Sequence, residues 1–133
     1  MIEVEVLGAS LAPDAPSLSE VTHLCVLAAS SRGVEDGHLA IEYVDAARIA
    51  ELNLDHRGKA GPTDVLSFPI DELTGQGEAP RELGDVVLCP QHTADLREAI
   101  VHGVLHLLGM DHETDNGEML DLQARLLSQA SSE

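Results

Sequence analysis

Three histidines in the stretch HGVLHLLGMDHE, residues 102–113, have the spacing of metal ligands. His102 and His106 lie four positions apart in a segment that we predict to be helical, so their imidazoles project from one helix face, one turn apart. Gly109 can end that helix in a left-handed conformation, and the turn after it brings in His112 from a third direction. Three neutral nitrogen ligands with an open fourth position are typical of catalytic zinc, because structural zinc sites usually fill all four positions. The alternative is three unrelated histidines on a helix and its exit loop.

The pattern H-x-x-x-H-x-x-G-x-x-H matches the metzincin protease signature except at one position. Those proteases have a glutamate directly after the first histidine, where it acts as the general base. Gly103 stands at that position here. A glycine cannot accept a proton, and inside a helix it costs about 1 kcal/mol relative to alanine. We therefore expect the zinc-binding geometry without ordinary peptidase chemistry.

The segments before residue 60 alternate between strand and helix patterns. A capping box at Ser17 and Glu20 predicts the start of the first helix, and Asp45 is the predicted N-cap of the second. The predicted elements are a strand over Ile2–Leu7, a helix from Ser17 to about Ser30, a strand over His38–Val44 and a helix from Asp45 through Leu52.

The second half of the chain contains two further strands and two further helices. The predicted elements are a strand over Asp64–Phe68 closed by Pro69, an exposed loop over Asp71–Glu82, a strand over Asp85–Leu88, a helix capped by Thr93 and running through Leu108, and a helix over Asn116–Ser128. The order βαβαββαα predicts a single α+β domain over residues 1–133. Its small mixed four-stranded sheet would be covered by helices, one of them a metzincin-like zinc helix.

The composition restricts the partners and the compartment. The chain has 24 acidic and 7 basic residues in 133, giving a net charge of −17. Such a charge disfavours non-specific attraction to nucleic acid, so any such contact would depend on a local basic spot or on the metal. Cys25 and Cys89 stand alone in apolar surroundings, as expected for buried thiols in a reducing compartment. No apolar run reaches the ~20 residues of a membrane span, and no signal peptide pattern is present, so we expect a cytoplasmic protein with no membrane partner.

The histidine stretch resembles the motif HGxLHLxGxDH of the YbeY endoribonucleases, which are bacterial rRNA maturation factors. Two further stretches are similar to that family and occur in the same order: LNLDHRGKAGPTDVLSFPID, residues 52–71, and LGDVVLCP, residues 83–90. The three stretches all lie between residues 52 and 113. It implies a zinc-dependent endoribonuclease that acts on single-stranded or ribosomal RNA in rRNA maturation and ribosome quality control. The implied partners are ribosomal RNA and the ribosomal small subunit or its basic proteins.

The resemblance also implies roles for particular residues. His102, His106 and His112 would hold one Zn²⁺ per chain, with a water at the open position, and Arg57 would be the functionally important arginine. A guanidinium near zinc can hold a phosphate bidentately and stabilise developing negative charge. The alternative for Arg57 is a surface ion pair in an acidic protein.

Four neighbouring side chains complete the predicted site. His56 and Lys59 flank Arg57 and are predicted to contact substrate. Asp85 and Asp111 are predicted to orient an imidazole through its second nitrogen, with a solvated surface carboxylate as the alternative for each. The general base is not identified by the sequence.

Two other functions remain open. One is a metallohydrolase of a peptide or amide bond with an unrecognised base, which activity restored by Gly103→Glu would support. The other is a ribosome-assembly factor with a mainly structural zinc, whose acidic surface binds basic ribosomal proteins.

Overall fold

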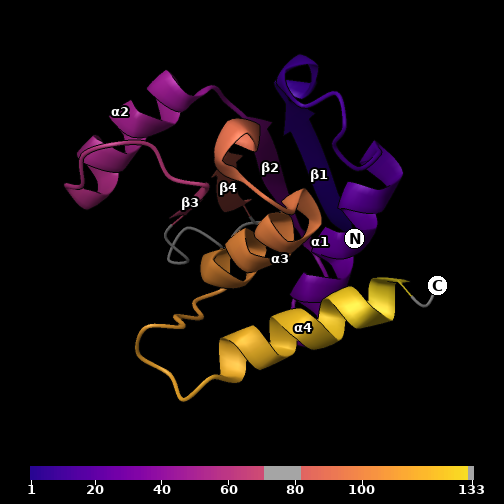
Figure 1. Cartoon of the computed structure of the whole chain (residues 1–133). Helices are drawn as coiled ribbons and strands as arrows, with labels where there is room; N and C mark the ends of the chain where they lie inside the picture. The colour runs from indigo at the N-terminus through magenta and orange to yellow at the C-terminus, as the bar shows by residue number, and fades with distance from the viewer. Residues whose placement is uncertain (71–81, 132–133) are drawn as a thin grey trace.

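The computed structural model describes residues 1–70 and 82–131 and contains one mixed four-stranded sheet (Figure 1). The strands are β1 (Ile2–Leu7), β2 (Gly37–Tyr43), β3 (Val65–Pro69) and β4 (Glu82–Leu88). Their order in the sheet is β1-β2-β4-β3. β1 pairs parallel with β2 and β2 parallel with β4, whereas β3 pairs antiparallel with β4. The mixed four-stranded sheet is therefore confirmed, and β3 is one of its edges.

Helices pack against both faces of this sheet. They are α1 (Leu18–Ser31), α2 (Ala46–Arg57), α3 (Leu96–Leu107) and α4 (Glu118–Ser131), with short 3-10 helices η1 (Ala9–Leu11) and η3 (Pro90–His92). α1 and α3 contact one face, and α4 packs on both of them (Figure 1). The larger core lies there, whereas α2 contributes Ile49 to a smaller cluster with Leu66 and Val87 on the other face. The α+β class predicted from the sequence is confirmed.

Side-chain caps decide where the helices begin. The Ser17 hydroxyl oxygen accepts from the Glu20 N–H at 3.2 Å, as predicted for α1. The predicted Thr93 cap of α3 is wrong. Asp95 caps that helix by accepting from the Glu98 N–H, while the Thr93 hydroxyl donates to the Cys89 carbonyl behind η3.

Three other predicted boundaries shift. α2 continues past Leu52 to Arg57 and ends at Gly58, whose φ of 69° lies in the left-handed region that favours glycine. α4 begins at Glu118 rather than Asn116, because Asp115 accepts from two N–H groups of the first turn. β4 begins at Glu82 rather than Asp85; the rest of the predicted loop, residues 71–81, lies outside the described residues.

Both cysteines are buried and free. Burial raises the pKa of the Cys25 thiol to about 12, so it packs as a small neutral side chain. Among the described residues, no helix has the length and apolar character needed to cross a membrane.

Candidate active site

The three histidines predicted as metal ligands come together at the C-terminal end of α3. The Nε2 atoms of His102 and His106 lie 3.2 Å apart. The ring centroid of His112 is 5.0 Å from that of His102 and 5.3 Å from that of His106. Ligand nitrogens from the three rings all lie within 4.8 Å of one another. Two nitrogens on one tetrahedral zinc, each ~2.0–2.1 Å from it, are separated by about 3.3 Å, so this geometry fits a single ion.

Hydrogen bonds fix which nitrogens of the two helix histidines are free. His106 Nδ1 donates to the Met110 carbonyl at 2.9 Å, because a carbonyl only accepts. His102 Nδ1 donates to Gln123 Oε1 at 2.8 Å. Both Nε2 atoms then present lone pairs that face each other, an arrangement that a cation between them would stabilise. Burial lowers the pKa of His106, and the charge of His102 lowers it further, which favours the neutral imidazole that a metal requires.

A turn that includes Gly109 carries His112 to the site. Gly109 has a φ of 95°, which favours glycine. The Asp111 carboxylate accepts from the Glu113 N–H at 2.9 Å and so holds the turn. In the described part of the chain, His112 Nδ1 is buried without a hydrogen-bond partner. A buried, unpaired imidazole nitrogen beside two lone pairs fits the donor set of a zinc centre.

Gly103, at the position of the protease base, is buried against strands β3 and β4. A Cβ at this position would lie 2.4 Å from Val86 Cγ1 and 3.2 Å from Val65 Cγ2. The Ser67 hydroxyl donates to the Gly103 carbonyl at 2.8 Å, which ties α3 to the edge strand. The glycine thus permits the close approach of helix and sheet. Gly103→Glu would disrupt this packing, so it is a poor test of peptidase chemistry.

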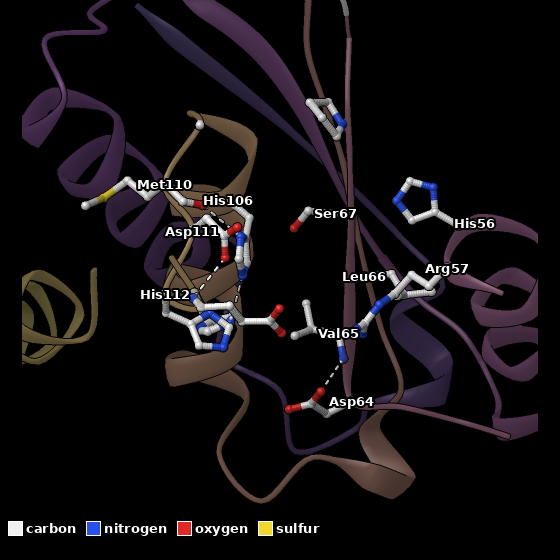
Figure 2. A pocket seen from close by; sticks show the side chains of 14 residues that line it. His56, Arg57, Asp64, Val65, Leu66, Ser67, His106, Met110, Asp111 and His112 are labelled. Carbon is white, nitrogen blue, oxygen red and sulfur yellow. Dashed lines mark hydrogen bonds between the residues drawn. The ribbon is translucent and has the colours of Figure 1, made fainter. Parts of the chain in front are cut away.

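The histidines form one wall of a cleft of about 660 Å³, and residues of α2 and β3 form the other (Figure 2). Arg57 and His56 line it from the last turn of α2, beyond the predicted end of that helix at Leu52. Figure 2 shows Arg57 extending from α2 toward β3, with His106 and His112 across the cleft. Arg57 is exposed and, among the described residues, pairs with no carboxylate.

Local contacts hold this second wall in place. The buried Asn53 donates from Nδ2 to the Gly61 carbonyl at 2.9 Å, which anchors the loop after α2. The His56 ring lies against Phe68, with ring centroids 4.4 Å apart. The Asp64 carboxylate accepts from the Val65 N–H at 2.8 Å and stabilises the start of β3.

Two predicted site residues lie elsewhere. Lys59 is exposed beyond Gly58 and is not among the residues that line the cleft. Asp85 alternates along β4 with Val86, whose side chain packs toward α3, so Asp85 points from the opposite face of the sheet. Asp111 lines the cleft, but its described contact is with the backbone of its own turn rather than with an imidazole.

The side chain that accepts from His102 Nδ1 is Gln123 of α4, which is not among the residues predicted from the sequence. It lies between the buried Met119 and Leu126, four positions after one and three before the other. In the sequence, the sign of this role is a polar residue within a stripe of apolar residues on one face of the helix.

The chain is similar to known proteins both in sequence and in fold. The family model for endoribonuclease YbeY matches residues 14–131. The chain is 47% identical to endoribonuclease YbeY of Micrococcus luteus over 71% of each chain. It is 39% identical to endoribonuclease YbeY of Rubrobacter xylanophilus, over 90% of this chain and 86% of that one. The solution structure of TM1509 from Thermotoga maritima has a similar fold, with a TM-score of 0.55 at 25% identity, covering 96% of this chain and 88% of that one.

Proposed function

The chain belongs to the endoribonuclease YbeY family, and from that membership we propose that it is a zinc-dependent endoribonuclease that cuts single-stranded or ribosomal RNA. The processes we propose for it are rRNA maturation and ribosome quality control. The observation that supports this most directly is that three metal-ligand histidines and the exposed Arg57 line one cleft. A metal site combined with an exposed guanidinium suits a phosphodiester better than an uncharged amide.

In this proposal the two walls of the cleft have different tasks. His102, His106 and His112 would hold the zinc ion, which as a Lewis acid would polarise a phosphoryl oxygen or activate water. Arg57 binds the scissile phosphate and stabilises the negative charge that develops on its oxygens. Since Arg57 is the cationic side chain among the residues that line the cleft, it is also the local basic spot that a chain of net charge −17 requires.

The nucleophile is either water or the 2′-hydroxyl of the RNA, and the products differ. Attack by the 2′-hydroxyl leaves a 2′,3′-cyclic phosphate and a 5′-hydroxyl end, whereas attack by water leaves a linear phosphate. Gly103 offers no base and is packed against Val86. The proton acceptor must therefore come from elsewhere in the cleft or from solvent.

The partners we propose are ribosomal RNA and the ribosomal small subunit or its basic proteins, in the cytoplasm. The exposed carboxylates of Glu3, Glu5 and Glu82 lie around His38 on the sheet face that α1 and α3 leave uncovered. Such a surface attracts basic proteins. Docking through protein contacts would let the Arg57 side of the cleft meet RNA despite the overall negative charge.

Metal removal and reloading tests this function. The protein is stripped with a chelator, and rRNA cleavage is measured before and after one equivalent of zinc is restored. We expect cleavage only in the zinc-loaded sample, with ends mapped by sequencing. Zinc binding without any cleavage would instead support the assembly-factor function, and cleavage of a peptide substrate would support the amide hydrolase.

A further inference from the structure

We infer that Gln123 is a positioning residue of the metal centre, whose side-chain oxygen holds His102 in the tautomer and orientation that present Nε2 to the ion. The inference rests on the proposed metal site but not on which bond the protein cleaves. The contact joins two helices across 21 positions of sequence: His102 Nδ1 donates to Gln123 Oε1 at 2.8 Å.

Gln123 is a buried polar residue, so its amide needs a hydrogen-bond partner within the protein. Its exposed fraction is 8%, and among the described residues it and Asn53 are the buried polar side chains. Burying an amide is unfavourable unless hydrogen bonds within the protein replace those to water. Met119 and Leu126 on either side are buried and apolar, so packing alone would be served by a leucine. The bond to His102 accounts for the polar residue at this position.

The start of α4 holds Gln123 in place relative to the turn that carries His112. The Asp115 carboxylate accepts from the Gly117 N–H through one oxygen and from the Met119 N–H through the other, each at 2.9 Å. α4 then packs along α3 and α1 (Figure 1). Gln123 therefore reaches His102 from a helix whose start is held by Asp115, three residues after His112.

The bond determines which nitrogen of His102 is available. With the proton on Nδ1 and directed at Gln123, Nε2 keeps its lone pair for a metal. His106 receives the same support from a backbone carbonyl, that of Met110, which no substitution removes. Of these two hydrogen bonds, the one to His102 is therefore the one that a side-chain substitution, at Gln123, can remove. An amide oxygen is a neutral acceptor, and a glutamate would keep the acceptor while adding a charge that favours a bound cation.

The test measures zinc affinity by competition with a chromophoric chelator, with no RNA present. Gln123→Leu removes the acceptor at similar volume, and Gln123→Glu retains it. Gln129→Leu makes the same change at an exposed position of the same helix. We expect Gln123→Leu to bind zinc about 10–100-fold more weakly, Gln123→Glu to bind at least as tightly as the wild type, and Gln129→Leu to match the wild type.

Urea unfolding of the metal-free proteins separates positioning from packing. Gln123→Leu is expected to be no less stable than the wild type without metal, because an apolar side chain replaces a buried amide; Gln123→Met provides a second apolar variant if the leucine fails to fold. Wild-type zinc affinity in both apolar variants would overturn the inference. So would equal weakening in Gln123→Leu and Gln123→Glu together with a loss of metal-free stability. Failure of RNA cleavage would count against the proposed function and leave this result unaffected.

Discussion

The two faces of the sheet are covered very differently, and the cleft lies at the edge strand β3 where they meet. One face is covered by α1 and α3 over an apolar core, and there His102 and His106 form hydrogen bonds to Gln123 and to the Met110 carbonyl. The other face has α2 over a small cluster around Ile49, and its remaining area has exposed carboxylates near His38.

The two walls of the cleft therefore differ in how firmly their side chains are held. His102 and His106 are held by hydrogen bonds to the Gln123 side chain and the Met110 carbonyl, which is how metal-binding histidines are usually oriented. Arg57 sits on the last turn of an exposed helix without an ion-pair partner among the described residues. A long, unpaired cationic side chain can adjust to a phosphate backbone whose position varies with sequence.

The largest effect is expected from breaking the histidine wall itself. His106→Ala removes one of three ligands and should weaken zinc binding by more than ~100-fold, because two imidazoles alone hold zinc poorly. Chelator competition measures this. His92→Ala, which changes an exposed histidine on η3, is the matched control. Equal zinc affinity in the two variants would mean that the histidine cluster is not the metal site.

The next largest effect is expected from the packing at Gly103, where a substitution should change the free energy of unfolding. Gly103→Ala places a Cβ 2.4 Å from Val86 Cγ1, and such overpacking typically costs about 1–3 kcal/mol. Helix propensity alone predicts the opposite, a gain of about 1 kcal/mol. Urea unfolding of the metal-free protein decides between them. An increase in stability would show that α3 does not approach the sheet this closely.

A change at Arg57, in the other wall of the cleft, should affect RNA binding rather than zinc affinity. Arg57→Gln is expected to weaken binding of single-stranded RNA by the metal-free protein and to reduce the slope of log K against log salt by about 0.7, the value for one phosphate contact. Zinc affinity should not change. Arg48→Gln, at an exposed position of the same helix, serves as the control. The same slope in both variants would place the phosphate contact elsewhere.

The smallest effect is a change in the pH dependence of stability, and it is expected at His38, on the sheet face that α1 and α3 leave uncovered. Its pKa is raised by the hydrogen bond to Glu82, with smaller contributions from the charges of Glu5 and Glu3. A raised folded-state pKa stabilises the protein below the ordinary histidine pKa of about 6.5, and this contribution disappears as pH rises through the folded-state value. His38→Gln should therefore lower the free energy of unfolding at pH 5.5 by about 0.5 kcal/mol more than at pH 8, as for a surface pair. A larger loss at pH 8 would contradict the sign.

Local sequence patterns predicted the features whose causes are local. The i, i+4 spacing of His102 and His106 and the helix-stopping Gly109 hold because a helix fixes these relations within a few residues. The Ser17 cap is correct for the same reason. The extra turn of α2 had a local signal, Gly58, that was overlooked.

The features that sequence reasoning missed depend on tertiary packing. The reason for a glycine at position 103 is the approach of Val86, which is distant along the chain. Gln123 reaches His102 only because α4 folds back along α3. Asp85 was predicted to support an imidazole, but strand alternation directs it to the other face once Val86 faces α3.

The most direct test of whether the histidines and Arg57 form one phosphodiester site is rRNA cleavage by three proteins, each supplied with zinc: the wild type, His106→Ala and Arg57→Glu. All three are first confirmed to be folded by circular dichroism. We expect the wild type to cut and both variants to lose at least ~100-fold in rate, as when one charge-stabilising group is removed. Equal cleavage by all three would contradict it, since the activity would then belong to neither the metal nor the arginine.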